Sequence, residues 1–342
     1  MLDIAREAGV AVGTVSRVVN QNPTVADDVR HRVLTAIRKT GWQPNVIARS
    51  MRTAATRTIG CVLPNFANPL FSLALKGIEQ RLSQRGYSLL ISSSDYEPAT
   101  DVRLVQLMAQ RRIDGLIYSP SSEHADAILN AIRSLATSVP IVLLERELDL
   151  TMDTVISDQE YGVCRAAEHL IALGHRRIAL VTGSAESNPG KSRYAGFLRA
   201  HAEAGLEPDP GLVRLGRYTA DYACRELGSL LSLPEPPTAL ISGGHMMLAG
   251  ILRGLETSRR RVPEDLSVIA IGETDLTEFA APSFTTVRWD LKTMGRDAAD
   301  LLLERIEDGQ PRGREARRIT VQPEIVLRRS CAAPPALRGP AS

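Results

Sequence analysis

The chain has 342 residues, more than one ordinary domain, so we expect at least two folding units. Apolar residues make up 44% of it and charged residues 23%, a composition typical of globular proteins. No apolar run approaches the ~18 residues of a membrane span, and the N-terminus lacks the apolar segment of a secretory signal. We therefore expect a cytoplasmic protein that does not contact a membrane. The four cysteines show no metal-ligand spacing, so we expect no metal and no other cofactor.

Charge is distributed unevenly along the chain. Residues 1–58 contain nine Lys and Arg against four Asp and Glu, which gives +5. The whole chain carries only +2, so the remainder carries −3. A small basic segment on a mildly acidic body indicates a polyanionic partner for that segment.

The pattern of secondary structure changes near Thr58. Before it, Gly and Pro separate short helices, expected over Leu2–Ala8, Val12–Asn20, Asp27–Lys39 and Val46–Arg52. After it, apolar strands alternate with amphipathic helices. The strands are expected over Ile59–Leu63, Ser88–Ser92, Gly115–Tyr118, Ile141–Leu144, Val155–Ser157, Ile178–Gly183, Val213–Leu215, Ala239–Ser242 and Val268–Ile271.

Continuous apolar strands between helices predict parallel sheets covered on both faces. There are too many such units for one simple sheet, so we expect two lobes that divide near residue 150. Ligands bind at the carboxyl ends of such strands, which here would face a cleft between the lobes. We expect the segment rich in Pro, Ala and Gly from Cys331 to Ser342 to be disordered.

Residues 4–20 carry the pattern of a helix-turn-helix. Ala5 is small enough for two helices to cross, Gly9 suits the turn, and Val15 and Val18 would be buried in the second helix. The opposite face of that helix exposes Val12, Gly13, Thr14, Ser16 and Arg17. Arg17 could pair bidentately with guanine, and Thr14, Ser16 and Asn20 suit bonds to phosphates or base edges. The alternative is an ordinary helical hairpin with a solvated Arg.

This stretch resembles the helix-turn-helix of the lactose-repressor (LacI/GalR-type) family. Further segments resemble that family in the same order, up to about residue 329. They are Pro44–Thr53, similar to its hinge helix, Thr56–Gly60, Asn68–Phe71, Arg112–Ile117, Gly174–Ala179 and Thr285–Arg288.

The resemblance implies an all-α helix-turn-helix headpiece and an α/β two-lobed core like a periplasmic binding protein, with doubly wound parallel sheets. We expect a headpiece at 1–43, a hinge helix and linker at 44–57, the core at 58–329 and a tail at 330–342. It also implies a homodimer that binds a near-palindromic DNA operator. The function implied is a transcriptional regulator, a repressor, that a small-molecule effector controls; it is not an enzyme.

The resemblance also assigns DNA contacts by position. Val12, Gly13 and Arg17 match base-reading positions, and Thr14, Ser16 and Asn20 match backbone contacts. The hinge helix would enter the minor groove with Asn45, Ala48 and Met51. Met51 stands where the family usually has Leu, and it would act as the apolar wedge that kinks the duplex.

The effector is expected to contact residues of both lobes. Phe71 matches a position that packs on the ligand, and Arg193 matches one that grips ligand oxygens. The alternatives are core packing for Phe71 and an exposed ion pair for Arg193. Glu145 and Asp158, at strand ends, are weaker candidates.

Two positions depart from the family pattern: Gly244-His245 stands where it often has Asn-Asp, and Gly272-Glu273 where it often has Asp. Because Arg193 persists and His245 could become cationic near neutral pH, we expect a sugar-like or acidic ligand, such as a sugar acid, that also contacts His245 and Glu273.

The helices of the headpiece lack the usual capping residues. Ala11 and Ala26 occupy two cap positions, and the first cap would lie upstream of Met1. Each lost cap costs about 0.5–2 kcal/mol. We therefore expect either a marginally stable headpiece or a true start upstream.

Two other functions have some support in the sequence. Residues 185–192 end like a phosphate-binding loop, but Ala185 replaces its first Gly, and Pro189 removes an N–H group. A periplasmic ligand-binding protein would account for the core but for neither the basic headpiece nor the missing signal sequence. The operator, the effector and the sign of their coupling stay open.

Overall fold

The computed structural model describes residues 1–19, 22–42, 55–66, 68–308 and 315–334. Contacts divide the chain into two units, Met1–Thr56 and Arg57–Ser342, each considered by itself. Within the described ranges, no helix has both the length and the apolar character needed to cross a membrane.

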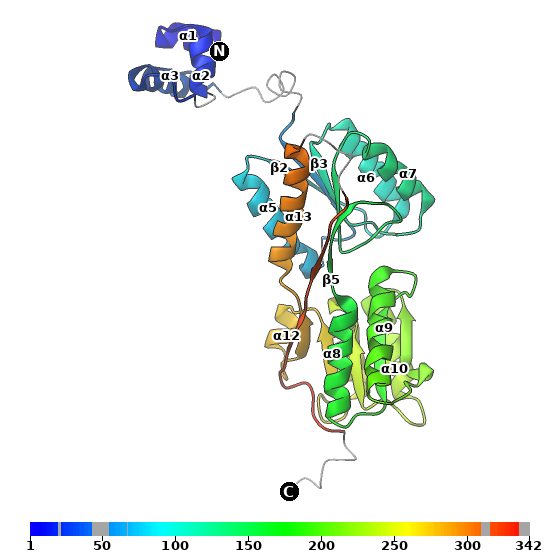
Figure 1. The fold of residues 1–342 in the computed structure, drawn as a ribbon. Coiled ribbons are helices and arrows are strands. Elements are labelled where there is room, and N and C mark those ends of the chain that lie inside the picture. Colours follow the sequence, from blue (N-terminus) through cyan, green and yellow to red (C-terminus); the bar gives the residue numbers. More distant parts are fainter. Residues whose placement is uncertain (20–21, 43–54, 67, 309–314, 335–342) are drawn as a thin grey trace. The chain divides into compact units, whose positions relative to one another are not determined.

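The described part of the first unit contains three helices, α1 (Leu2–Ala8), α2 (Val12–Val19) and α3 (Asp27–Thr40) (Figure 1). Gly9 ends α1 in the left-handed conformation (φ 64°), which favours glycine, and lets the Val10 N–H bond to the Ala5 carbonyl. The helices enclose a small core that consists of Ile4, Ala5, Ala8, Val15, Val18, Val25, Val33 and Ala36.

The second unit contains two six-stranded sheets, here called lobe 1 and lobe 2. The lobe 1 sheet has the order β11-β5-β4-β3-β1-β2, and all neighbouring strands are parallel. Its strands are β1 (Thr58–Leu63), β2 (Ser88–Ser93), β3 (Gly115–Tyr118), β4 (Ile141–Leu144), β5 (Asp153–Ser157) and β11 (Arg318–Val321).

The lobe 2 sheet has the order β12-β10-β9-β8-β6-β7, and only β10 and β12 pair antiparallel. Its strands are β6 (Ile178–Gly183), β7 (Val213–Gly216), β8 (Ala239–Ser242), β9 (Ser267–Ile271), β10 (Thr285–Arg288) and β12 (Glu324–Val326). The two doubly wound sheets confirm the predicted fold class.

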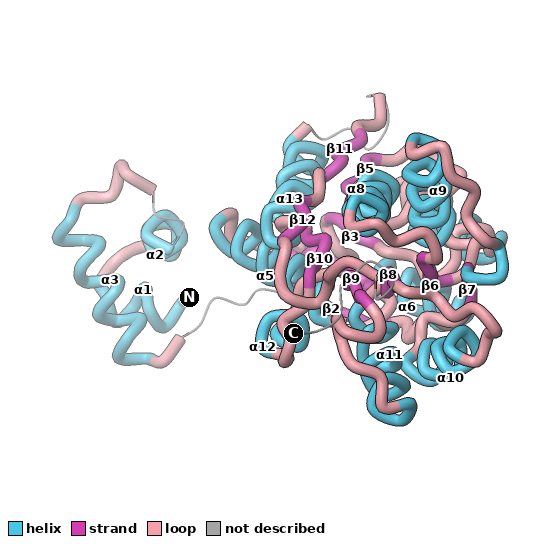
Figure 2. The backbone as a smooth tube through the Cα atoms, turned by 90° about the horizontal axis from the view of Figure 1, so that it is seen from below, coloured by secondary structure: helices cyan, strands magenta, loops and turns pink. Residues whose placement is uncertain are grey.

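Helices cover both faces of each sheet (Figure 2). In lobe 1, α5 (Pro69–Gln84) packs with α13 (Leu291–Glu307), and α6 (Pro98–Gln110) packs with α7 (Asp126–Leu135). In lobe 2, α8 (Gln159–Ala172) packs with α9 (Asn188–Glu203), and α10 (Ala220–Leu231) packs with α11 (His245–Ser258). A 3₁₀ turn (Pro210–Leu212) and the short α12 (Asp275–Phe279) complete lobe 2.

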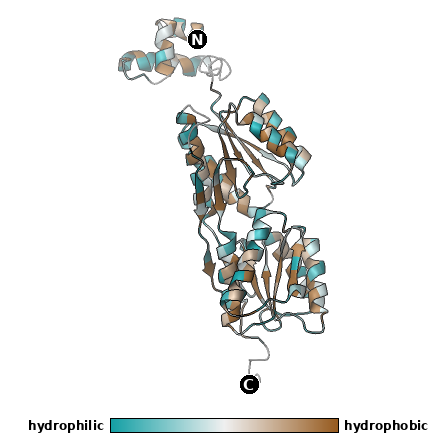
Figure 3. Ribbon diagram, turned by 45° about the vertical axis from the view of Figure 1, so that its right-hand side comes forward, coloured by the Kyte–Doolittle hydropathy of each residue, from teal (hydrophilic) through white to brown (hydrophobic). Residues whose placement is uncertain are grey.

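The strands of both sheets are the most hydrophobic parts of the unit, and the helices are polar on their outer sides (Figure 3). Helices α5 and α13 approach so closely that a Cβ atom on Gly77 would lie 2.1 Å from the Lys292 carbonyl oxygen, and one on Gly295 would lie 2.0 Å from that of Ala74. Only glycine permits this distance between the two backbones.

The predicted division of the core near residue 150 was wrong. Strand β5 belongs to lobe 1, so the chain first crosses to lobe 2 after Ser157. It returns to lobe 1 after β10 to form α13 and β11, then crosses again between Val321 and Glu324 to form β12. The lobes are therefore joined by three crossings of the chain, and α13, β10, β11 and β12 lie beyond the last strand expected from the sequence pattern.

The predicted start of the disordered tail, at residue 330, was also wrong. Ser330 is fully buried, and its hydroxyl donates to the Val268 carbonyl and accepts from the Thr285 N–H. Ala332 exchanges hydrogen bonds with the hydroxyl of Ser267. These hydrogen bonds hold Ser330 and Ala332 against lobe 2 and satisfy buried polar groups on both sides. Residues 335–342 lie outside the described part of the chain.

Candidate DNA interface and ligand site

Helix α2 is amphipathic, and its outward side carries the residues expected to read DNA. Val15 and Val18 are buried in the headpiece core, which sets the orientation of the helix. The residues left exposed or half-exposed are Val12, Gly13, Thr14, Ser16 and Arg17. The second helix of such a motif places these positions in a major groove. Asn20, Asn45, Ala48 and Met51, the other expected DNA contacts, lie outside the described residues.

The headpiece helices begin without side-chain caps, as expected. Met1 and Ala26 precede α1 and α3, and neither side chain bonds to the first turn. In α2, the first-turn N–H groups of Thr14 and Val15 bond to the Ala11 carbonyl. An exposed ion pair between Lys39 and Glu7 (2.6 Å) links α1 to α3. Exposed pairs of this kind contribute little to stability.

In the second unit, Arg193 lies in the second turn of α9 and is only 8% exposed. All its hydrogen bonds go to neutral groups: Nε donates to Gln159 Oε1 (2.8 Å), and Nη1 donates to the Gly243 carbonyl (2.5 Å) and to Thr182 Oγ1 (3.4 Å). Among the described residues, no carboxylate lies within ion-pair distance of this guanidinium. The alternative of an exposed ion pair is therefore wrong. A buried cation without an anion is costly, so the position favours an anionic ligand.

A chain of hydrogen bonds connects Arg193 in lobe 2 to Glu145 in lobe 1. Gln159, which accepts from Arg193, donates through Nε2 to Ser157 Oγ (2.6 Å). Ser157 in turn donates to Glu145 Oε2 (2.8 Å). Burial raises the pKa of Glu145, although the Ser157 bond and the charge of Arg193 act in the opposite direction. The network thus joins two of the predicted effector residues through two that the sequence analysis missed.

The backbone at Glu145 supports a role for this residue. Glu145 follows β4 with φ 60°, a left-handed conformation that non-glycine residues rarely adopt. Asp95 and Tyr96, which follow β2, have φ values of 53° and 62°. Such strained positions cluster at functional sites, where the surrounding structure holds them.

Two tyrosines lie close to Arg193. Burial raises the pKa of Tyr218 to about 12, while the charge of Arg193 acts to lower it. Burial also raises the pKa of Tyr96, and Asn68, Arg146 and Arg193 act to lower it. Tyr96 follows β2 of lobe 1 and Tyr218 follows β7 of lobe 2, so the two lobes each contribute a phenol near the guanidinium.

Gly244 and His245 show why this chain departs from the family pattern. Gly244 has φ 149°, and a Cβ atom there would lie 1.8 Å from the Tyr218 hydroxyl, so Tyr218 occupies the space of a larger residue. The His245 ring lies 6.3 Å from the Tyr218 ring, and its buried Nδ1 has no hydrogen-bond partner among the described residues. Burial lowers the pKa of His245, which disfavours a positive charge on the ring. A ligand contact by His245 stays a prediction.

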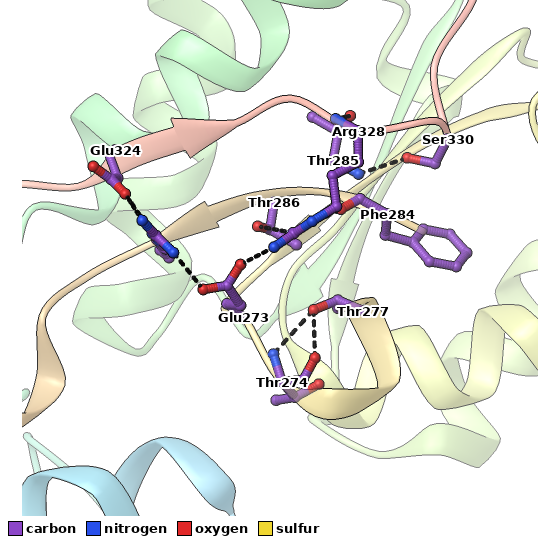
Figure 4. Close-up of polar contacts among 10 residues, drawn as sticks. Glu273, Thr274, Thr277, Phe284, Thr285, Thr286, Glu324, Arg328 and Ser330 are labelled. Carbon is purple, nitrogen blue, oxygen red and sulfur yellow. Dashed lines mark hydrogen bonds and ion pairs between the residues drawn. The ribbon is translucent and has the colours of Figure 1, made fainter. Parts of the chain in front are cut away.

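Glu273 is bound to arginines of its own lobe rather than available to a ligand (Figure 4). Its carboxylate pairs with Arg328 and with Arg288 Nη1 (2.9 Å), and Arg288 also pairs with Glu324. Burial acts to raise the pKa of Glu273, but these two arginines outweigh it and hold the pKa below its usual value. Beside it, the Thr277 hydroxyl accepts from the Thr274 N–H and donates to the Thr274 carbonyl at the start of α12, as Figure 4 also shows. These contacts indicate a structural role for Glu273.

Asp158 also has a structural partner. Its Oδ1 accepts from the Tyr161 N–H (2.9 Å) and so caps α8, and its Oδ2 accepts from Gln322 (3.3 Å). Phe71 is half-buried in the first turn of α5 and packs against the main hydrophobic core. This packing fits the alternative reading of Phe71, and a ligand contact by either residue remains a prediction.

In the loop that resembles a phosphate-binding loop, several backbone N–H groups already have hydrogen-bond partners. The N–H groups of Ser187 and Lys191 bond to the carbonyls of Ser184 and Ser187, and that of Gly190 bonds to the Ser187 hydroxyl. The Asn188 N–H bonds to the carboxylate of Glu123. These donors are therefore engaged, which disfavours nucleotide binding here.

Among the described residues, one group has a metal-binding geometry: Cys164, Glu168 and Glu203. Arg199 donates to Cys164 Sγ (3.3 Å) and lies 3.6 Å from Glu203. A guanidinium thus already supplies the positive charge between these groups, which disfavours a metal ion.

Sequence reasoning missed Tyr96, Tyr218, Gln159, Ser157 and Arg146. Each lies at or just after the carboxyl end of a parallel strand: β2, β7, β5 or β4. The rule that ligands bind at these ends was the signal that could have found them.

Comparison with known proteins matches each of the two units to a protein family. Residues 1–45 match "Bacterial regulatory proteins, lacI family", and residues 167–331 match a "Periplasmic binding protein-like domain". The HTH-type transcriptional regulator DegA of Bacillus subtilis is 32% identical over 332 residues, covering 96% of both chains. The HTH-type transcriptional repressor PurR of Haemophilus influenzae is 32% identical over 329 residues, covering 96% of this chain and 97% of PurR.

Solved structures agree over nearly the whole chain. The lac repressor dimer bound to operator and the anti-inducer ONPF has a TM-score of 0.84 at 27% identity, covering 97% of this chain and 98% of the repressor. The transcriptional regulator CelR in complex with cellobiose has a TM-score of 0.74 at 30% identity, covering 96% of this chain and 98% of CelR.

Proposed function

The chain belongs to the lacI family of bacterial regulatory proteins, and we propose that it is a transcriptional repressor whose affinity for a DNA operator is controlled by a small molecule. It acts in the cytoplasm as a homodimer and catalyses no reaction. The exposed side of α2, anchored by Val15 and Val18, is the observation that supports DNA reading. Arg17 carries base recognition from this side, with Val12 and Gly13, while Thr14 and Ser16 contact the backbone.

Selection of bound sequences from random DNA by the full-length protein tests this function. Phosphate contacts make the affinity salt-dependent, so the ionic strength is held fixed. The expected result is a near-palindrome with half-sites about one helical turn apart, as two headpieces of a dimer require. Recovery of no enriched sequence would argue against an operator-binding function.

The effector binds between the lobes, with Arg193 as its principal polar contact. Arg193 is a buried cation that has no ion pair within the described residues, so the ligand carries an acidic group that pairs with its guanidinium. Burial disfavours a charged His245, and Glu273 already pairs with arginines, so Arg193 supplies the charge of this contact. Tyr96 and Tyr218 supply aromatic surface and hydroxyl groups to a sugar-like body.

Calorimetry with sugar acids and the matching neutral sugars tests the ligand class. An aldonate or uronate should bind more tightly than its neutral counterpart. Arg193→Gln should abolish that preference, a loss of about 2–5 kcal/mol for a buried charge pair. Arg199→Gln, on the same helix but paired with Glu160, is the matched control and should leave binding unchanged. Tighter binding of the neutral sugars would contradict the proposal.

A further inference from the structure

One buried carboxylate, that of Glu123, links the two lobes. Glu123 lies in lobe 1 after β3 and is 4% exposed. One oxygen, Oε1, lies 3.2 Å from Nη1 of Arg146, which follows β4 of the same lobe. The other, Oε2, accepts a 2.7 Å hydrogen bond from the backbone N–H of Asn188 in lobe 2.

The lobe 2 partner is the start of a long helix. Asn188 is the first residue of α9, and helix N-termini attract anions because their N–H groups are unpaired and the dipole is positive there. Arg193, the proposed effector contact, lies on the same helix. The loop before α9 resembles an anion-binding loop in sequence, and the anion that it binds is a side chain of the protein itself.

Helix α9 transmits this contact to the rest of lobe 2. A Cβ atom on Gly196 would lie 2.1 Å from the Glu160 carbonyl oxygen, so α9 and α8 are in direct backbone contact. Anchoring the first residue of α9 therefore positions the lobe that carries both helices. The chain itself joins the lobes at three crossings. The hydrogen bond from Asn188 to Glu123 is a further link, and it must break when the lobes move apart.

We propose that Glu123 is an interlobe latch: its carboxylate holds α9 against lobe 1 and sets how readily the cleft opens to the effector. The role rests on the proposed function, because it concerns entry to the effector cleft. Opening replaces the bond by water at both Glu123 and Asn188, so the latch is reversible. A charge-assisted bond of this kind stabilises the closed arrangement more than a neutral one does.

Hydrogen exchange of the full-length protein tests the latch without DNA or effector, so its outcome is independent of the proposed function. Glu123→Gln keeps the size of the side chain and removes its charge. Exchange over residues 186–192 should become about tenfold faster, the difference between a charged and a neutral acceptor. Asp126→Asn removes a charge from an exposed position nearby and should change nothing.

A second variant acts from the other lobe. Asn188→Pro removes the donating N–H but leaves the Glu123–Arg146 pair intact, so it decides the question if Glu123→Gln folds poorly. Proline suits the first turn of a helix, and Ser187 already has the extended ψ of 142° that a following proline requires. Exchange over residues 119–124 should rise by a similar factor. Unchanged exchange in both variants would overturn the proposal.

Discussion

Side-chain caps are common at the starts of the lobe helices, although α6, α7 and α11 lack one, and they are missing from α1 and α3 of the headpiece. In the lobes, side chains cap several first turns: those of Asn68, Asp158, Ser187, Thr219 and Asp290. In the headpiece, Met1 and Ala26 offer no such bond. The headpiece relies on a small apolar core, and its polar side chains are left mostly at the surface. Internal polar contacts therefore contribute more to the lobes than to the headpiece.

The clearest example of an internal polar contact in the lobes is the buried ion pair of lobe 1. Asp153, on β5, accepts two 2.7 Å bonds from Arg305 on α13, and its side chain is 1% exposed. Asp153→Asn should lower the free energy of unfolding of the core by about 3–5 kcal/mol, because it leaves a buried arginine without its anion. Urea denaturation of a Trp42→Phe background, in which Trp289 reports on the core, measures the effect.

The matched control is Glu147→Gln, which removes an ion pair to Arg318 that is 40% and 55% exposed at its two side chains. That loss should not exceed ~1 kcal/mol. An Asp153 variant no less stable than the Glu147 variant would show that the buried pair does not stabilise the core.

The same pair predicts how core stability depends on pH. Burial acts to raise the pKa of Asp153, but the bonds from Arg305 and Arg317 outweigh it and hold the pKa below its usual value. A depressed folded-state pKa gives stability that is present above the unfolded value of about 3.9 and is lost as pH falls through the folded value. Asp153→Asn should remove this part of the acid dependence.

Adding helix caps to the headpiece should make it more stable. Ala26→Ser and Ala11→Ser should each raise the free energy of unfolding of the headpiece by about 0.5–2 kcal/mol, because a hydroxyl would then accept from the first turn. In a Trp289→Phe background of the full-length protein, Trp42 reports on this transition. Ala204→Ser, at the end of α9, is the control. Equal headpiece stability with and without the new hydroxyls would contradict the capping argument.

Local pattern and resemblance predicted much of the fold. The central strands were found because runs such as Ile141–Leu144 are apolar throughout. The order of the strands was not, because β5 pairs not only with the nearby β4 but also with β11, whose residues lie more than 150 positions further along the chain. Strands β11 and β12 lie at sheet edges and are only half-buried, so they lack an apolar run.

The candidate site was predicted less completely than the fold. Position within the family pattern pointed to Arg193 and Glu145, but it could not show that Gln159 and Ser157 connect them. Glu273 was expected to face the ligand, yet Arg288 and Arg328 bind its carboxylate. These outcomes depend on which charged groups the tertiary fold brings together, and local spacing carries no information on that.

The most direct test of the account repeats the selection from random DNA with wild type and Arg17→Ala side by side. Wild type should enrich a near-palindrome, and Arg17→Ala should lose preference at the same position of both half-sites, a change of about 1–3 kcal/mol for one bidentate base contact. The loss should be confined to that position, because phosphate contacts affect all sequences alike. An identical enriched sequence from both proteins would contradict the claim that α2 reads the operator through Arg17.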